Sequence, residues 1–395
     1  MSTLKYSRFF LDRDKKMGKY IHRYIQKPVI QDLSRKMIFI GGPRQSGKTT
    51  LAKYICEQAD YNLRERYLNW DAAEDRENII RENFPAGKGI LILDEIHKYS
   101  RWRQVVKGLF DKRGNELNII VTGSARLDYY RRGGDSLQGR YHFYRLLPLT
   151  INEIGTSNPS ALADLLKYGG FPEPLLLRSE KETRRWSREY RSRVVQGDLS
   201  DLENVMDIGI IENLVIRLPD VVGSPLSINA LREDLQVSHQ SVSRWIYMLE
   251  NLYMIFRIFP FGSPIIRAVK KEAKHYHMDW TTIADPSARF ENLVACHLLK
   301  WCYFMQDTEG IDVELRYFRD IDKREVDFVI VKNNLPVHFI ECKSSDKNTS
   351  LSLRYLKKRF PHVAATQVIL TDEVDHITKH GIRICSASRF LGNFI

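Results

Sequence analysis

Residues Gly42 to Thr49 read GPRQSGKT and match the phosphate-binding pattern GxxxxGK[ST] in full. Glycines in such a loop let backbone N–H groups turn toward a β-phosphate, at a helix N-terminus whose dipole favours an anion. Lys48 can reach the β- and γ-phosphates, and the Thr49 hydroxyl is suited to Mg²⁺. The apolar run 37–40 before the loop and the helical spacing after it give the strand–loop–helix context that such a site requires. We therefore predict that ATP and Mg²⁺ bind here, with the nucleotide held by Gly42, Pro43, Arg44, Gln45, Ser46, Gly47, Lys48, Thr49 and Thr50.

Two carboxylates follow the next apolar run, 89–93. A buried strand that ends at Asp94 would place this carboxylate near the Mg²⁺ coordination shell. Glu95 could then orient and deprotonate the attacking water. An apolar run followed by Asp-Glu is common by itself, but downstream of a complete phosphate loop it favours a hydrolytic site.

Two further side chains are candidates for the same chemistry. Ser124 follows the apolar run 117–121 and could sense the γ-phosphate, although a turn capped by Ser or Thr is an equal alternative. Arg140 is the best candidate for an arginine finger that stabilises transition-state charge in a neighbouring subunit. The alternative for Arg140 is a solvated basic surface, because the surrounding stretch is rich in arginine.

A second group of charged residues lies near the C-terminus. Asp327 lies in one strand-like run, and Glu341 and Lys343 lie in the next, where period-2 alternation puts both on one face. This arrangement resembles the PD-(D/E)xK nuclease core, in which two carboxylates hold Mg²⁺ and the lysine positions water. Glu291, on a preceding helical stretch, resembles the extra acidic residue of such cores. The alternatives are a solvated strand edge, or a nuclease-like fold kept for binding or packing.

Between these two groups, the stretch 228–255 reads as helix, turn and helix, with a β-like tail. Ser238 fits the N-cap of the second helix. The exposed face of that helix would carry side chains suited to bases or phosphates. The candidate DNA-binding residues are His239, Gln240, Ser243 and Arg244. The alternative is a winged helix used for packing or oligomer contacts, because the helix carries one arginine and DNA affinity depends on phosphate neutralisation.

The hydrophobic pattern indicates the elements that position these residues. Apolar runs at 37–40, 89–93 and 117–121, separated by segments of helix length, predict an α/β fold with a parallel sheet covered on both faces. Nearer the C-terminus we predict a helix at 288–301 and strands at 314–318, 326–331, 337–342 and 366–370. The predicted domains are a P-loop ATPase domain (1–156), a helical lid or linker (157–222), a winged-helix module (223–262) and a nuclease-like α/β domain (263–395).

Composition limits the class of protein. The 395 residues are enough for two or three domains, and 43% hydrophobic and 28% charged residues exclude wholesale disorder. A formal net charge of +12 favours a polyanionic partner, nucleic acid first. The five cysteines are scattered, and no run reaches the ~20 apolar residues that a membrane helix needs. We therefore expect reduced thiols, no membrane partner and a cytoplasmic location.

Taken together, the motifs resemble a known family. The order GPRQSGKTT, ILILDEIHKYSRW, IIVTGSA, SLQGRYHFYRLLPLTINEI and GGFPEP is similar to the AAA-type ATPases of archaea and bacteria that carry a C-terminal domain of unknown function. The similarity covers nearly the whole chain. It implies an ASCE-type fold in which Lys48, Thr49, Asp94 and Glu95 bind or hydrolyse ATP, and in which Ser124 is a sensor.

These observations predict a Mg²⁺-dependent ATPase coupled to a winged helix and a nuclease-like domain, acting on or near DNA. One alternative is a regulatory switch, in which the ATP state controls protein partners and an inactive nuclease-like domain serves assembly. Another is a nuclease that the P-loop domain only gates.

Overall fold

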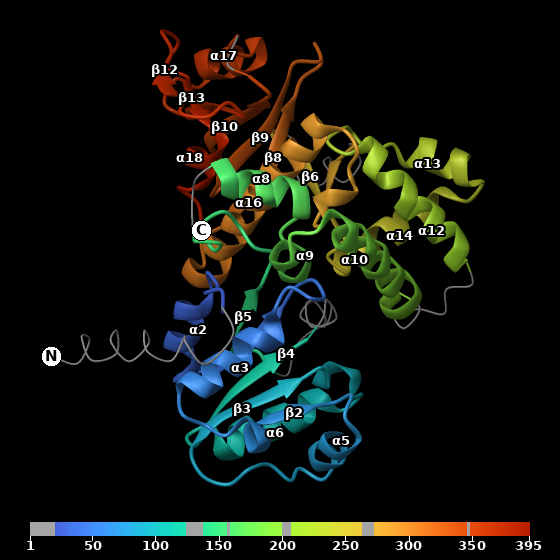
Figure 1. Cartoon of the computed structure of the whole chain (residues 1–395), viewed down its shortest axis with the longest axis vertical. Coiled ribbons are helices and arrows are strands. Elements are labelled where there is room, and N and C mark those ends of the chain that lie inside the picture. Colours follow the sequence, from blue (N-terminus) through green and yellow to red (C-terminus); the bar gives the residue numbers. More distant parts are fainter. Residues whose placement is uncertain (1–19, 124–136, 156–158, 200–206, 263–271, 346–347) are drawn as a thin grey trace, which may run out of the picture. The chain divides into compact units, whose positions relative to one another are not determined.

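The computed structural model describes residues 20–123, 137–155, 159–199, 207–262, 272–345 and 348–395 (Figure 1). The chain divides into two compact units, which we call unit 1 (Met1–Leu146) and unit 2 (Leu147–Ile395).

Unit 1 is built on a five-stranded sheet in the order β2-β3-β4-β1-β5, and every neighbouring pair is parallel. The predicted α/β fold with a parallel sheet is therefore confirmed. Strands β1 and β3 are buried along their whole length, which explains their unbroken apolar runs. The strands are β1 (Met37–Gly41), β2 (Tyr67–Asn69), β3 (Gly89–Asp94), β4 (Leu117–Thr122) and β5 (Tyr141–Arg145).

Short helices connect these strands and complete the core of unit 1. Trp102, Val106 and Leu109 lie on one face of α6 and pack against buried side chains of the sheet such as Phe39 and Leu91. Burying side chains of this size stabilises the unit by about 1.5–3 kcal/mol each. The helices of unit 1 are α2 (Gln26–Leu33), α3 (Lys48–Gln58), α4 (Leu63–Arg66), α5 (Ala73–Ile80), η1 (Ile96–Lys98) and α6 (Trp102–Arg113).

The register of the parallel strands determines what meets at the carboxyl edge of this sheet. Thr122 at the end of β4 pairs with Ile40 on β1 and with Asp94 on β3. The loop that follows β1 and the carboxylate that ends β3 therefore lie at the same edge, as they do in phosphate-binding α/β folds.

Unit 2 contains an eight-stranded mixed sheet in the order β12-β13-β11-β10-β9-β8-β6-β7. The four predicted strands of this region are present, with different bounds, as β8, β9, β10 and β11. The strands are β6 (Ile255–Pro260), β7 (Lys274–His277), β8 (Val313–Arg319), β9 (Glu325–Lys332), β10 (Leu335–Lys343), β11 (Ala364–Ile369), β12 (Asp375–Ile377) and β13 (Arg383–Ser386).

The helices of unit 2 include the predicted one at 288–301, which extends over Pro286–Glu309 as α16. Asp285 caps its N-terminus by accepting a hydrogen bond from the Ala288 N–H. The other helices are α8 (Pro159–Tyr168), α9 (Pro172–Leu177), α10 (Glu180–Arg193), η2 (Val194–Leu199), α12 (Ile208–Arg217), η3 (Leu218–Val221), α13 (Ile228–Leu235), α14 (His239–Asn251), η4 (Trp280–Thr282), α17 (Leu351–Arg359) and α18 (Ala387–Leu391).

The C-terminal part of unit 2 has the order α16-β8-β9-β10-α17-β11. Strands β8, β9 and β10 form an antiparallel meander, and β11 returns parallel to β10 after α17. A helix in a parallel crossover covers one face of the sheet, so α17 buries Leu353 and Leu356 against it.

One strand connects the helix-turn-helix to this sheet. β6 follows α14 and pairs antiparallel with β7, and it also pairs parallel with β8 through Phe259 and Pro260. The predicted boundary at 262/263 therefore lies beside a strand that belongs to the same sheet as β8.

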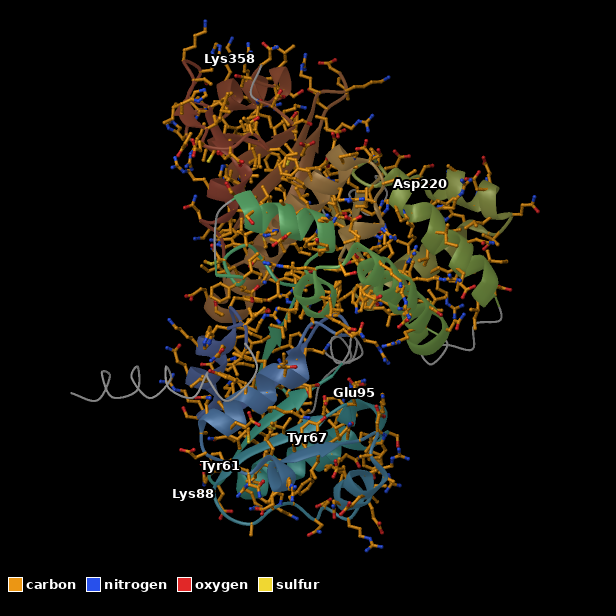
Figure 2. The ribbon with its side chains drawn as sticks, in the orientation of Figure 1. Tyr61, Tyr67, Lys88, Glu95, Asp220 and Lys358 are labelled. Atoms are coloured by element: carbon orange, nitrogen blue, oxygen red, sulfur yellow. The ribbon has the colours of Figure 1, made fainter. Side chains whose placement is uncertain are left out.

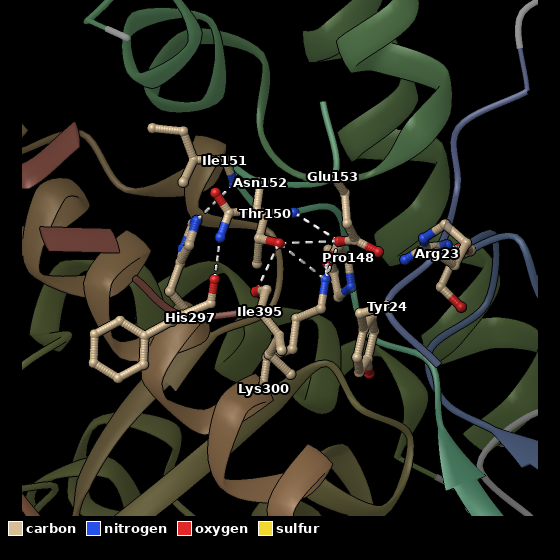
Figure 3. Close-up of polar contacts among 12 residues, drawn as sticks. Arg23, Tyr24, Pro148, Thr150, Ile151, Asn152, Glu153, His297, Lys300 and Ile395 are labelled. Atoms are coloured by element: carbon tan, nitrogen blue, oxygen red, sulfur yellow. Dashed lines mark hydrogen bonds and ion pairs between the residues drawn. The ribbon is translucent and has the colours of Figure 1, made fainter. Parts of the chain in front are cut away.

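A buried polar cluster fixes the segment after Leu147 to α16 (Figure 3). Lys300 Nζ donates to the Pro148 carbonyl oxygen at 2.8 Å and forms a buried ion pair with Glu153. Glu153 Oε2 also accepts from the Thr150 N–H at 3.0 Å. The Thr150 hydroxyl donates to the Ile395 carbonyl oxygen at 3.0 Å. Both charges of the cluster are thus paired within unit 2.

Within the described ranges, no helix combines the length and the apolar character needed to cross a membrane.

Candidate functional site

The loop between β1 and α3 has a backbone that glycine makes possible at two positions. Gly42 has φ +136°, and a Cβ there would lie 2.4 Å from the Leu146 carbonyl oxygen. Gly47 precedes α3 with φ +95°. Residues other than glycine rarely adopt these backbone conformations. The loop can therefore have this shape because the sequence has glycine at both positions. The curled loop at a helix N-terminus forms the cradle expected for nucleotide phosphates.

Lys48 is held against this loop. Its ammonium donates to the carbonyl oxygens of Gly42, at 3.1 Å, and Pro43, at 2.6 Å. The side chain is buried at the first position of α3. A phosphate oxygen carries negative charge, so it attracts the ammonium more strongly than a neutral carbonyl oxygen does. The lysine is therefore placed to exchange these carbonyls for phosphate oxygens.

Asp94 accepts hydrogen bonds from three hydroxyl groups at the carboxyl edge of the sheet. Thr49 Oγ1 lies 2.9 Å from Asp94 Oδ2, Tyr67 OH lies 2.8 Å from the same oxygen, and Thr122 Oγ1 donates to Oδ1. The structure thus brings together the two residues predicted to hold Mg²⁺, Thr49 and Asp94. Their hydroxyl and carboxylate oxygens are hard donors of the type that Mg²⁺ prefers, so the residues present fit this ion.

Sequence reasoning missed Tyr67. Burial raises the pKa of its phenol, and the neighbouring Asp94 carboxylate raises it further. The phenol therefore stays protonated and donates to the carboxylate, which fixes the orientation of Asp94. The signal in the sequence is weak, because Tyr67 lies in a strand of only three residues.

Glu95 follows β3 in a left-handed conformation, with φ 55°. Its N–H donates to the Thr122 carbonyl oxygen at 3.0 Å, which holds the residue at the edge of the sheet. Oε2 is buried, lies 3.5 Å from Lys98 Nζ, and accepts no hydrogen bond from the residues that the structure describes. Burial raises the pKa of Glu95, whereas Lys98 and Lys48 lower it. A raised pKa makes a carboxylate a better general base near neutral pH. Figure 2 labels Glu95 and Tyr67.

The structure does not bring Arg140 to this edge. Arg140 directly precedes β5, and Met37 pairs with Tyr141 at the start of β1, whereas the phosphate loop follows the other end of that strand. At about 3.3 Å per residue, the two ends of β1 are roughly 13–16 Å apart. The guanidinium forms a two-pronged ion pair with Asp111, at 2.8 and 3.2 Å. Arg140 therefore does not lie beside the phosphate loop of its own unit. The other candidate, Ser124, lies outside the described residues.

In unit 2, two of the predicted acidic residues, Glu291 and Asp327, lie with Glu325 around a lysine that sequence reasoning missed. Lys274 is 1% exposed, and its ammonium lies 2.6 Å from Glu325, 3.7 Å from Glu291 and 3.9 Å from Asp327. Burial lowers the pKa of Lys274, but the three carboxylates more than offset this effect and the pKa is raised. The only local signal was a charged residue at the start of a short strand-like run.

The three predicted carboxyl groups, on α16, β9 and β10, share a buried environment. Burial raises the pKa of Glu291, Asp327 and Glu341, and the charge of Asp327 further raises the pKa of Glu291 and Glu341. Asp327 Oδ2 accepts from the Cys342 N–H at 2.8 Å, so its carboxylate reaches the neighbouring strand. These three predicted residues are therefore brought close together.

The arrangement is nevertheless not an assembled metal site. Glu341 Oε1 pairs with Lys343 Nζ at 2.8 Å, and its buried Oε2 accepts no hydrogen bond from a described residue. Among the described residues, no group of three or more His, Cys, Asp and Glu side chains is arranged to hold a metal ion. The ammonium of Lys274 supplies the cation in this cluster, so the donor set does not fit Mg²⁺ as it stands.

The helix-turn-helix presents the face that the sequence predicts. Ser238 caps α14 by accepting from the Ser241 N–H at 3.0 Å, which confirms the predicted N-cap. His239, Gln240 and Arg244 are exposed, and Ser243 is half-buried with its hydroxyl 3.4 Å from His239 Nδ1.

Comparison with known families divides the chain into three matches. Residues 34–155 match an AAA domain, residues 160–284 match a domain of unknown function (DUF8612), and residues 287–390 match another domain of unknown function (DUF4143). Together with the parallel sheet and the phosphate loop, the first match shows that the chain carries an AAA-type P-loop domain.

Similar curated proteins come from bacteria and archaea. An uncharacterized protein of Mycobacterium bovis is 23% identical over 243 residues, which cover 62% of this chain and 54% of that protein. An uncharacterized protein of Methanocaldococcus jannaschii is 24% identical over 275 residues, which cover 62% of this chain and 61% of that protein. The chain thus spans between half and two thirds of the length of these relatives.

Solved structures with partial similarity include two proteins. The Thermotoga maritima RuvB Holliday junction branch migration motor is 17% identical, with a TM-score of 0.34, over 62% of this chain and 92% of that chain. The Aeropyrum pernix Orc1 protein in complex with DNA is 15% identical, with a TM-score of 0.34, over 70% of this chain and 93% of that chain.

Proposed function

We propose that this chain is a Mg²⁺-dependent ATP-binding protein and ATPase. The observation that carries the proposal is the hydrogen bond from Thr49 to Asp94 directly behind the phosphate loop. The bond brings a hydroxyl and a carboxylate side by side, which supports a site for nucleotide-bound Mg²⁺ at this position. Bound Mg²⁺ would neutralise developing phosphate charge.

Three side chains contribute the remaining steps of hydrolysis: Lys48 in the loop, Glu95 after β3, and Arg140 before β5. Lys48 exchanges its loop carbonyls for β- and γ-phosphate oxygens. Glu95 accepts the proton of the attacking water, and its raised pKa suits that role. Arg140 of a neighbouring subunit would stabilise transition-state charge, and this requires a homo-oligomer in which the ion pair with Asp111 opens.

We further propose that ATP turnover is coupled to DNA binding in the cytoplasm. The net charge of +12 and the exposed polar face of α14 support a nucleic-acid partner. The order α16-β8-β9-β10-α17-β11, with acidic residues on α16, β9 and β10, supports a restriction-endonuclease-like domain. The coupling would then run from the AAA-type domain through the winged helix to the nuclease-like domain.

A second function is favoured by Lys274. Because its ammonium already lies among Glu291, Glu325 and Asp327, the nuclease-like domain of a regulatory switch could serve assembly without cleaving DNA. ATP state would then control protein partners.

One experiment separates these functions. Phosphate release from Mg·ATP is measured for the full chain and for Lys48→Ala, with EDTA, with duplex DNA and with single-stranded DNA. We expect turnover that EDTA and Lys48→Ala both abolish and that DNA stimulates. Turnover that persists in Lys48→Ala contradicts the ATPase site, and turnover that is indifferent to DNA favours the switch.

A separate experiment tests cleavage. Supercoiled DNA is incubated with the full chain and Mg²⁺ or Mn²⁺, and Lys343→Ala should abolish cleavage if the domain is an active nuclease.

A further inference from the structure

Unit 2 contains a cationic pocket that neither the ATP site nor the acidic cluster uses. It has a volume of about 500 Å³ and lies where α8, α10, η4 and α16 meet. We call it the arginine pocket. Its charged lining residues are Lys167, Glu180, Arg184, Arg188, Arg191 and Arg289.

Among the described residues that line the arginine pocket, cations outnumber carboxylates. Five cations face one carboxylate, Glu180, which lies 2.7 Å from Lys167 and 3.7 Å from Arg184. Arg191 donates to the Ser187 carbonyl oxygen at 3.4 Å, and Arg289 donates to the Ile283 carbonyl oxygen at 2.8 Å. Bonds to backbone carbonyls orient a guanidinium but leave its full charge.

Arg188 is the clearest case. It is exposed and makes no ion pair with any residue that the structure describes. Arg184, Arg188 and Arg191 follow one another at i, i+4 and i+7 on α10, so they share one face of the helix. Like charges at this spacing destabilise a helix unless an anion or solvent compensates them. The sequence thus places three repelling cations on the face that lines a pocket.

Beside these arginines, hydroxyl groups that line the pocket are hydrogen-bonded to the buried residue Asp279. The buried Asp279 carboxylate accepts from the Ser187 hydroxyl at 2.5 Å and from the Thr281 hydroxyl at 2.6 Å. The Thr282 hydroxyl donates to the Asp279 carbonyl oxygen at 3.0 Å. These donors already have an acceptor, so ligand recognition falls to the guanidinium groups. The bond from Ser187 to Asp279 ties α10, which carries three of the arginines, to the start of η4.

We propose that the arginine pocket binds a small ligand that carries two or more phosphate groups. A planar guanidinium group can donate two parallel hydrogen bonds to two oxygens of one phosphate group. Two phosphate monoesters carry about −3 to −4 at pH 7, which matches the unbalanced charge of the lining. The volume falls within the roughly 300–1,000 Å³ that small-molecule sites occupy. All residues that line this pocket belong to unit 2.

The test uses inorganic pyrophosphate, with calorimetry on the full chain carrying Lys48→Ala to suppress binding at the phosphate loop. We expect saturable binding that the added pair Arg188→Ala and Arg191→Ala weakens at least tenfold and that rising salt weakens. The matched control is Arg185→Ala, on the same helix but outside the pocket and paired with Glu182 at 3.2 Å. It should leave the affinity unchanged.

Three outcomes overturn the proposal. The first is the absence of pyrophosphate binding, and the second is binding that the pocket variants do not change. The third is the binding of a single-stranded oligonucleotide, but not of pyrophosphate, with the same dependence on Arg188, because the pocket would then hold a nucleic-acid backbone. Equal thermal unfolding midpoints for the pocket and control variants show that the difference is not one of folding.

Discussion

The ammonium of Lys274 lies 2.6 Å from Oε1 of Glu325 in the interior of unit 2, and this pair determines the charge balance of the acidic cluster. Arg319 reaches the other oxygen of Glu325 at 3.7 Å from a half-exposed position. Glu291, with its hydrogen bond from Tyr276 at 2.8 Å, depends on Lys274 as its nearest cation among the described residues. One residue therefore decides whether the cluster is a stable ion-pair network or a set of repelling carboxylates.

Lys274→Met should destabilise unit 2 by about 3–5 kcal/mol, because it leaves buried carboxylates without their cation. Mn²⁺ should then raise the unfolding temperature of Lys274→Met more than that of the wild type, since a divalent ion can replace the lost charge. Thermal unfolding with and without Mn²⁺ measures both effects. Lys332→Met, at the exposed end of β9, is the matched control. An equal response to Mn²⁺ in wild type and Lys274→Met would show that Lys274 does not exclude metal.

Glu95→Gln should retain ATP binding and lose turnover by roughly 10²–10⁴-fold, because the amide cannot accept the proton of water. Calorimetry measures the affinity, and phosphate release measures the turnover. Glu116→Gln, an exposed change before β4, should alter neither. Wild-type turnover in Glu95→Gln would remove Glu95 from the role of base.

Arg140→Ala should lower turnover by about 10³-fold with little change in ATP affinity, because a finger acts mainly in the transition state. Asp111→Asn, which loosens the ion pair of Arg140, should not lower turnover. Mixing Arg140→Ala subunits with Glu95→Gln subunits should restore activity, since each subunit supplies what the other lacks. A loss of affinity in Arg140→Ala would instead mean that Arg140 binds ground-state nucleotide.

The buried histidines should make unit 2 sensitive to acid. Burial lowers the pKa of His275 and His297 to about 4 each, so both are neutral in the folded chain at pH 6. The unfolded chain binds protons below about pH 6.5, and stability is lost as the pH falls from there toward 4, by up to about 1.4 kcal/mol per pH unit for each histidine.

His297→Gln isolates one such contribution. His297 accepts from the Ile151 N–H at 3.2 Å through Nε2, so the variant should be less stable at pH 7.5 but should lose less further stability by pH 5. Burial raises the pKa of Glu291 to about 8 and that of Glu341 to about 7, so both contribute with the opposite sign over a window that overlaps that of the histidines. The difference between variant and wild type is therefore the quantity to measure. Equal slopes in both would show that His297 does not titrate with unfolding.

The sequence predicts the phosphate loop and the strand that ends at Asp94, because the determinants of both are local. The phosphate loop spans eight consecutive residues, and Asp94 directly ends an apolar strand. A parallel sheet then brings the ends of β1 and β3 to one edge without further information. Tyr67 escapes such reasoning, because its role follows from the register of β2 beside β3, which short-range pattern does not determine.

In unit 2 the sequence predicts individual helices and strands better than it predicts which of them contact one another. The sequence indicates acidic positions on α16, β9 and β10, but Lys274 reaches those on α16 and β9 from β7 through tertiary contacts. The arginine pocket likewise assembles from α8, α10, η4 and α16, and no segment shows it alone. Long-range contacts of this kind leave no periodic signal in the chain.

The double pairing of β6 has a mechanical consequence. α14 ends at Asn251 and β6 begins at Ile255, so the helix that carries His239 and Arg244 is attached by a few residues to a strand shared with β8. β8 in turn pairs with β9, which carries Asp327. A force applied to α14 would act on the hydrogen bonds that join β6, β8 and β9, and β9 carries part of the acidic cluster. α14 is therefore joined to the strand that carries Asp327 by strand pairing, and not by a long flexible linker.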